Sequence, residues 1–239
     1  MLPSVSTVQP LTRSLMPVPQ SYIAGLDLGQ AADYSALSIL QHAGPGERPW
    51  QPEQRFHLRH LERWPLGTSY PAIVTDVVGM LSTLARQGDV TLALDATGCG
   101  RPVLDLFRAA LPKSPGAGWA GQDMPVTPRV RLIAISITGG DRVTSDSGTY
   151  NVPKRDLASA VQVALQTRRL TIAEGLPDTA VLVAELQNFR VKISLAGHDS
   201  YAAGSGEPWR EGSHDDLVLS VACALWAAQR TRGARLQAV

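Results

Sequence analysis

The chain has 239 residues, enough for one large domain or two small ones with a substantial hydrophobic core. Hydrophobic residues make up 44% and charged residues 18%, which excludes a disordered chain, a coiled coil and a collagen-like fibre. The 22 basic and 21 acidic residues leave a formal net charge of +1. The composition therefore lacks the basic surplus that is typical of nucleic-acid-binding proteins.

Apolar runs predict strands, and apolar residues at helical spacing predict helices. In chain order, we expect a flexible leader (1–20), strands over 22–28, 36–42 and 55–64, a helix over 70–86, a strand over 90–96 and a helix over 102–111. A loop over 112–128 is followed by a strand over 130–138, a helix over 154–166, a short strand over 170–173 and a helix over 178–190. The chain then continues with a hairpin or mobile loop over 190–212, a buried helix over 213–230 and a basic tail over 231–239.

This order predicts an α/β fold. The first three strands have no helices between them, which favours antiparallel pairing, whereas the later helical crossovers favour parallel strands. We therefore expect one mixed β-sheet over residues 21–230 with helices on both faces. Only two cysteines, Cys99 and Cys223, are present, which indicates a reducing compartment. No apolar run reaches the roughly 18 residues of a membrane helix.

Two of the predicted strands end in an aspartate. Asp27 and Asp95 each lie in an apolar stretch, where an ionised carboxylate costs several kcal/mol unless a cation or hydrogen bonds compensate it. Aspartates on adjacent strand ends would make a hard oxygen site that suits Mg²⁺ or Mn²⁺. The alternative is that each aspartate only caps the turn after its strand.

A third acidic group opens the last predicted helix. Asp215 and Asp216 follow His214 and precede an apolar run. Ser213 and Asp216 fit a helix capping box, which explains one of the two aspartates. A buried helix that begins with an acidic pair can also deliver a carboxylate to a site between helix and sheet. Three carboxylates from two strands and a helix are typical of a two-metal centre for phosphoryl transfer.

Other polar residues are weaker candidates. Asp33 either reaches the metals or forms a turn. Lys154 and Arg155 open a helix, where cations oppose the helix dipole, so they either contact phosphate or lie on a solvated face. Glu185 is expected on the helix surface, and the alternative is that it supports the residues of the site. The candidate DNA-contact cations of the 190–212 segment are Arg190, Lys192 and Arg210, and a lidding loop is the alternative for that segment.

Six segments together resemble a known family. They are GLDLGQ (25–30), DYSAL (33–37), LDATG (94–98), VPKRDL (152–157), ELQNF (185–189) and GSHDDLV (212–218). In this order they resemble the nuclease domain of phage terminase large subunits, which has an RNase H-like fold of the retroviral-integrase-like superfamily. The strand motif alone is weak, but the ordered series is fairly specific.

The resemblance implies a Mg²⁺- or Mn²⁺-dependent endonuclease that cuts double-stranded viral DNA during packaging in the cytoplasm of a bacterial host. Asp27 and Asp95 become metal ligands, and the third ligand falls on Asp215 or Asp216. His214 becomes a neighbouring ligand or orients water, and residues 190–212 match a hairpin near DNA. Implied partners are a packaging ATPase, a small terminase and a portal protein.

One feature departs from full-length terminase large subunits. The sequence has no G-x-x-x-x-G-K-[ST] motif, so we expect no packaging motor in this chain. It is either an excised domain or a free-standing relative. Two other functions stay open: an ATP-binding phosphotransferase of the actin and sugar-kinase type, and a catalytically inactive module that binds DNA or protein.

Overall fold

The computed structural model describes residues 20–29, 33–43, 55–97, 100–111, 130–196 and 215–236. These residues form eight strands and five helices. The strands are β1 (Gln20–Asp27), β2 (Ser35–Ala43), β3 (Arg55–Trp64), β4 (Gly88–Asp95), β5 (Val130–Thr138), β6 (Thr144–Asp146), β7 (Thr149–Pro153) and β8 (Leu170–Ile172). The helices are α1 (Tyr70–Ala85), α2 (Gly100–Ala110), α3 (Lys154–Gln166), α4 (Thr179–Ala196) and α5 (Asp216–Leu236).

All eight strands form one mixed sheet, in the order β6-β7-β5-β4-β1-β2-β3-β8. Strands β1, β2 and β3 pair antiparallel, as the absence of intervening helices predicted. Strands β1, β4, β5 and β7 pair parallel, as the helical crossovers predicted. The predicted α/β fold with a mixed sheet is therefore confirmed, and it places the carboxyl ends of β1 and β4 next to each other.

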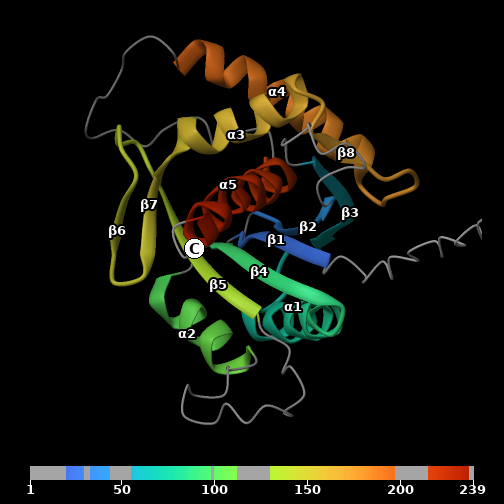
Figure 1. Ribbon diagram of the computed structural model, residues 1–239, viewed down its shortest axis with the longest axis vertical. Helices are drawn as coiled ribbons and strands as arrows, with labels where there is room; N and C mark the ends of the chain where they lie inside the picture. The colour runs from blue at the N-terminus through green and yellow to red at the C-terminus, as the bar shows by residue number, and fades with distance from the viewer. Residues whose placement is uncertain are drawn as a thin grey trace, which may run out of the picture.

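Helices cover both faces of the sheet (Figure 1). On one face, α1 and α2 pack on a core that includes Leu26, Leu37 and Leu92. On the other face, α5 lies across β1, β2 and β4, and α3 and α4 cover its outer side. Because α5 is enclosed by sheet and helices, its residues 216–228 are all buried, as its nearly continuous apolar sequence predicted.

Helix α1 illustrates how local sequence signals set an element's start. Ser69 is its N-cap, and the Ser69 hydroxyl accepts a hydrogen bond from the Ala72 amide at 3.4 Å. Pro71 in the first turn has no amide hydrogen to satisfy there.

No helix in the described part of the chain is long and apolar enough to cross a membrane.

Two helix ends differ from the sequence-based expectations. Helix α4 continues to Ala196, so residues 190–196 are helical rather than part of a hairpin or loop. Helix α5 continues to Leu236, which makes most of the expected basic tail helical. Both extensions lengthen a helix that already packs on the core, and each added residue forms one further backbone hydrogen bond. The leader before Gln20, the 112–128 loop and residues 197–214 lie outside the described residues.

The sequence-based interpretation also missed the β6–β7 hairpin. Ser147 and Gly148 both have positive φ, 48° and 82°, which is the backbone of a two-residue hairpin turn that matches strand twist. The Ser-Gly pair between β-forming residues was a signal for this turn. The hairpin matters for the site because β7 leads directly into Lys154, the first residue of α3.

Candidate active site

Asp27 and Asp95 lie side by side at the carboxyl edge of the sheet. Their strands pair in parallel, with Leu26 opposite Leu94, so the last residues of β1 and β4 are neighbours. Side chains alternate between the two faces of a strand. Ala93 belongs to the core beneath α5, and Asp95, two residues later, faces the same side. Both aspartates are buried, with 8% and 7% of their surfaces exposed.

Helix α5 approaches β1 closely at Gly25. A Cβ atom on Gly25 would lie 1.8 Å from the Ser220 carbonyl oxygen and 2.9 Å from the Ala224 amide nitrogen. Only glycine leaves room for this helix backbone against the strand. Asp216 lies one helical turn before Ser220, and Asp27 lies two residues after Gly25. The close contact therefore brings the first turn of α5 to the strand-end aspartates.

The pKa of Asp27 reflects the nearby carboxylates. Burial is the largest cause that raises the Asp27 pKa well above its ordinary value. The negative charges of Asp95, Asp216 and Asp215 raise the pKa further, in that order, and so does a hydrogen bond with the Asp95 side chain. The pKa of the Cys223 thiol on α5 is raised by burial, then by Asp95 and Asp27. The structure thus brings together the four predicted carboxylates.

Asp95 also organises the turn after β4. Its Oδ1 accepts hydrogen bonds from the Thr97 amide, at 2.8 Å, and from the Thr97 hydroxyl. The Thr97 hydroxyl oxygen in turn accepts one from the Ile137 amide of β5, at 2.7 Å. Asp95 therefore caps the turn after β4 through one carboxylate oxygen, and the residue also lies beside Asp27 among the other acids.

Asp215 and Asp216 both lie near Asp27, in different surroundings. Asp216 is 6% exposed and is the first residue of α5. Asp215 directly precedes the helix, and its Oδ2 lies 3.6 Å from the Lys154 ammonium nitrogen. That ammonium group also lies 5.9 Å from the centre of the Phe189 ring. Lys154 therefore lies at the edge of the acidic cluster. The positive end of the α5 dipole also stabilises the negative charges of both aspartates.

Glu185 is buried beside the acidic cluster, whereas the sequence-based expectation placed it on the surface. Only 5% of the residue is exposed, and its Oε2 accepts a hydrogen bond from the Val218 amide of α5 at 3.0 Å. The surface expectation is wrong because Glu185 shares a helix face with Leu182 and Phe189, which are both buried. Their spacing of three and four residues from Glu185 was the signal that could have found it.

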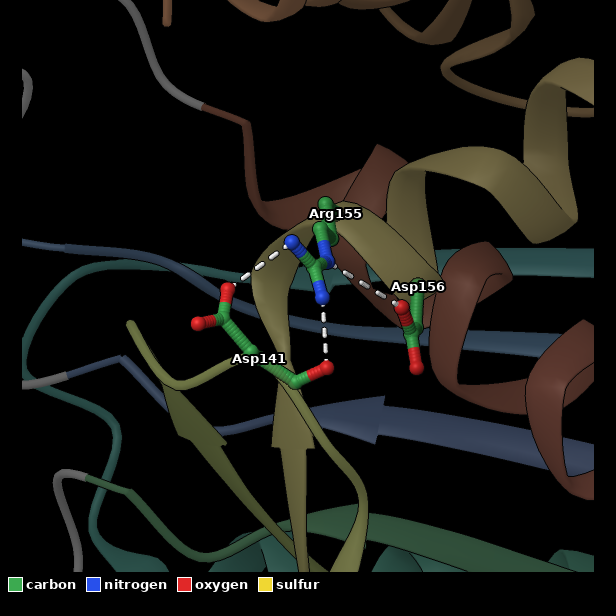
Figure 2. A network of polar contacts seen from close by, with 3 residues as sticks. All are labelled: Asp141, Arg155 and Asp156. Atoms are coloured by element: carbon green, nitrogen blue, oxygen red, sulfur yellow. Dashed lines mark hydrogen bonds and ion pairs between the residues drawn. The ribbon is translucent and has the colours of Figure 1, made fainter. Parts of the chain in front are cut away.

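The remaining candidates do not join the cluster or cannot be placed. Asp33 is half-buried in the bend after β1 and is not among the carboxylates that raise the Asp27 pKa. Arg155 turns to Asp141 and Asp156 (Figure 2), with Nη1 2.9 Å from the Asp141 carboxylate and Nε 3.8 Å from that of Asp156. His214 and Arg210, and the side chains of Arg190 and Lys192, lie outside the described residues.

The donor set suits a hard divalent cation. No group of three or more His, Cys, Asp and Glu side chains among the described residues is arranged as a ready-made metal site. The four aspartates are nevertheless all oxygen donors, largely buried, and repel one another strongly enough to raise the Asp27 pKa. Lys154 forms an ion pair with Asp215 at the edge of the cluster. A divalent ion would compensate this charge, so the residues fit Mg²⁺ or Mn²⁺.

The fold is similar to that of solved nuclease domains. The nuclease domain of the human cytomegalovirus terminase, in a manganese-soaked crystal, superposes with a TM-score of 0.50 at 14% identity, covering 89% of this chain and 86% of that one. The chain has the fold of a terminase nuclease domain. This RNase H-like architecture agrees with the resemblance drawn from the six sequence segments.

Weaker similarities accompany this one. The large terminase nuclease of a thermophilic phage matches with a TM-score of 0.43 at 19% identity, covering 86% of this chain and 81% of that one. The large terminase of bacteriophage HK97 matches with 0.47 at 15% identity, and the match covers 89% of this chain but only 40% of the HK97 protein. No protein-family profile and no curated protein sequence matches the chain.

The Glu185 carboxyl links stability to pH. Burial first, then Asp216 and Asp215, raise its pKa from about 4.5 to about 7, against the Val218 hydrogen bond and Arg63, which lower it. Between these values the folded chain holds a proton that the unfolded chain has lost, so the free energy of unfolding falls as pH rises. We expect this group to contribute a loss of roughly 1–3 kcal/mol between pH 4.5 and pH 7.

Urea unfolding in EDTA at pH 5 and pH 8 measures this loss. Glu185→Gln removes the titrating proton and should make stability less dependent on pH, whereas the exposed Glu174→Gln should behave like wild type. The same pH dependence in Glu185→Gln and wild type would contradict the expectation.

Proposed function

We propose that this protein is a divalent-metal-dependent endonuclease that hydrolyses phosphodiester bonds of double-stranded DNA. The observation that carries the proposal is the convergence of Asp27, Asp95, Asp215 and Asp216, two from the sheet edge and two from the start of α5. A domain that needed these aspartates only for its fold would gain nothing from gathering four mutually repelling carboxylates, three of them buried, in one place. The terminase-like fold supports the same reaction class.

The proposal assigns separate roles to the residues. Asp27, Asp95 and Asp216 would hold two Mg²⁺ or Mn²⁺ ions, with Asp215 as a further ligand. Ions held there supply Lewis-acid stabilisation to phosphodiester hydrolysis. Lys154, at the edge of the cluster, can pair with Asp215 without DNA and contact a backbone phosphate when DNA is present. Arg155 is a weaker candidate for phosphate contact because Asp141 and Asp156 already neutralise it.

The proposed biological setting is termination of viral DNA packaging. The similar human cytomegalovirus domain is part of a terminase, and its crystal was soaked with manganese. By analogy, this chain would cut packaged DNA in the cytoplasm of a bacterial host, together with a packaging ATPase, a small terminase or a portal protein. His214, Arg190, Lys192 and Arg210 stay candidate accessory and DNA-contact residues in this proposal. Asp33 also stays a candidate accessory residue, although it is not among the carboxylates that raise the Asp27 pKa.

Cleavage of supercoiled plasmid tests the proposed activity. We expect nicked and linear products with Mn²⁺ or Mg²⁺ and none with EDTA. Asp95→Ala should remove the activity because it deletes a ligand at the end of β4. Asp89→Ala is the matched control, because Asp89 is exposed near the opposite end of the same strand. Cleavage that persists in EDTA or in Asp95→Ala would contradict the proposal, and ATP hydrolysis without DNA cleavage would favour a phosphotransferase.

A further inference from the structure

Glu185 connects α4 to the catalytic end of α5. Its Oε2 accepts the Val218 amide hydrogen at 3.0 Å, and its Oε1 is buried without a hydrogen-bond partner among the described residues. Burying a carboxyl group in this way carries a desolvation cost that an apolar side chain would avoid. The residue therefore needs an explanation beyond packing between Leu182 and Phe189.

The hydrogen bond satisfies an amide group in the first turn of α5. The first amides of a helix have no carbonyl partner within the helix, and a side chain usually caps them from the preceding residue. Val218 is the third residue of α5, and its amide is capped by Glu185 from a different helix. A carboxylate at this position also interacts favourably with the positive end of the helix dipole.

Helix α5 is consequently held at two points beside its aspartates. Ser220 rests against Gly25 of β1, which limits how closely the helix approaches the sheet. Val218 is tied to Glu185 of α4, which limits rotation and sliding of the first turn. Asp216 lies only two residues before Val218 and four before Ser220. A small movement of this turn would therefore move the α5 carboxylates relative to Asp27 and Asp95.

We propose that Glu185 is a positioning residue that holds the first turn of α5, and with it Asp215 and Asp216, in register with the sheet carboxylates. This inference rests on the proposed metal centre, because its consequence is the affinity of that centre for divalent ions. Residues that orient metal ligands through hydrogen bonds typically change metal affinity about 10- to 100-fold when they are replaced.

Two substitutions separate positioning from direct charge effects. Glu185→Ala removes the hydrogen bond, whereas Glu185→Gln keeps an oxygen that can accept from the Val218 amide and removes the negative charge. Isothermal titration with Mn²⁺ without DNA should show at least about tenfold weaker binding for Glu185→Ala and near wild-type binding for Glu185→Gln. Glu174→Ala, an exposed glutamate just before α4, is the control and should bind Mn²⁺ like wild type.

Amide hydrogen exchange in EDTA provides a second readout that needs no metal. The Val218 amide should exchange faster in Glu185→Ala and stay protected in Glu185→Gln and Glu174→Ala. If Glu185→Gln loses Mn²⁺ affinity as severely as Glu185→Ala, the charge itself acts at the ion and the positioning role is overturned. Unchanged Val218 exchange in Glu185→Ala would also overturn it. Failure of the wild-type protein to bind Mn²⁺ would instead refute the proposed metal centre, while the exchange comparison would still decide whether Glu185 anchors α5.

Discussion

Asp27→Asn is expected to reduce metal-dependent cleavage by at least about a hundredfold and to raise the melting temperature in EDTA. Activity should fall because the substitution removes a proposed ligand and a charge from the centre that would stabilise the transition state. Stability should rise because the neutral amide relieves the desolvation and the repulsion from Asp95, Asp216 and Asp215 that raise the Asp27 pKa. Each kcal/mol of relief should raise Tm by about 2–4 °C in a chain of this size.

Plasmid cleavage and scanning calorimetry, carried out on the same preparations, measure the two effects. Asp105→Asn is a suitable control because the Asp105 side chain is 66% exposed on α2, and its salt bridge to Arg108 is at the surface. It should change neither quantity. A large loss of stability in EDTA for Asp27→Asn, or wild-type cleavage by that variant, would show that Asp27 serves the fold rather than the reaction.

Gly25→Ala is expected to destabilise the protein by about 3 kcal/mol or more, at the upper end of the cost of overpacking a core. The added Cβ would lie 1.8 Å from the Ser220 carbonyl oxygen and 2.9 Å from the Ala224 amide nitrogen. Both are backbone atoms and cannot rotate away, so α5 itself must move off β1. Any folded fraction should bind Mn²⁺ more weakly, because the movement carries Asp216 away from Asp27.

Gly79→Ala is the matched control for this substitution. Gly79 lies in the exposed part of α1, and a Cβ atom there would meet nothing within 4 Å. Alanine should stabilise the helix by up to about 1 kcal/mol, since glycine is a poor helix former. Urea unfolding compares the two variants with wild type. Equal stabilities for Gly25→Ala and Gly79→Ala would contradict the close packing of α5 on β1.

Sequence patterns predicted most of the elements because their signals are local. The strands that became β1, β2 and β4 are short apolar runs, and α1 carries a serine cap and apolar residues at helical spacing. The mixed sheet also followed, since chain order alone shows which strands lack a helical crossover. The ends of α4 and α5 could not be found in this way, because a helix whose start is already held by packing can be extended without a new nucleation step.

The candidate site was likewise predicted in part from local sequence signals and in part determined by tertiary packing. The sequence by itself determined which aspartates lie in or next to apolar segments. These are Asp27 and Asp95 in apolar strands, and the Asp215–Asp216 pair before an apolar helix. Only the tertiary structure decided that the four acids lie together, because their proximity depends on the parallel pairing of β1 with β4 and on the contact of α5 with Gly25. It also decided the place of Glu185. The reason is physical: the cost of burying a charge can be recognised along the chain, but the groups that share or compensate it are brought there by packing between distant segments.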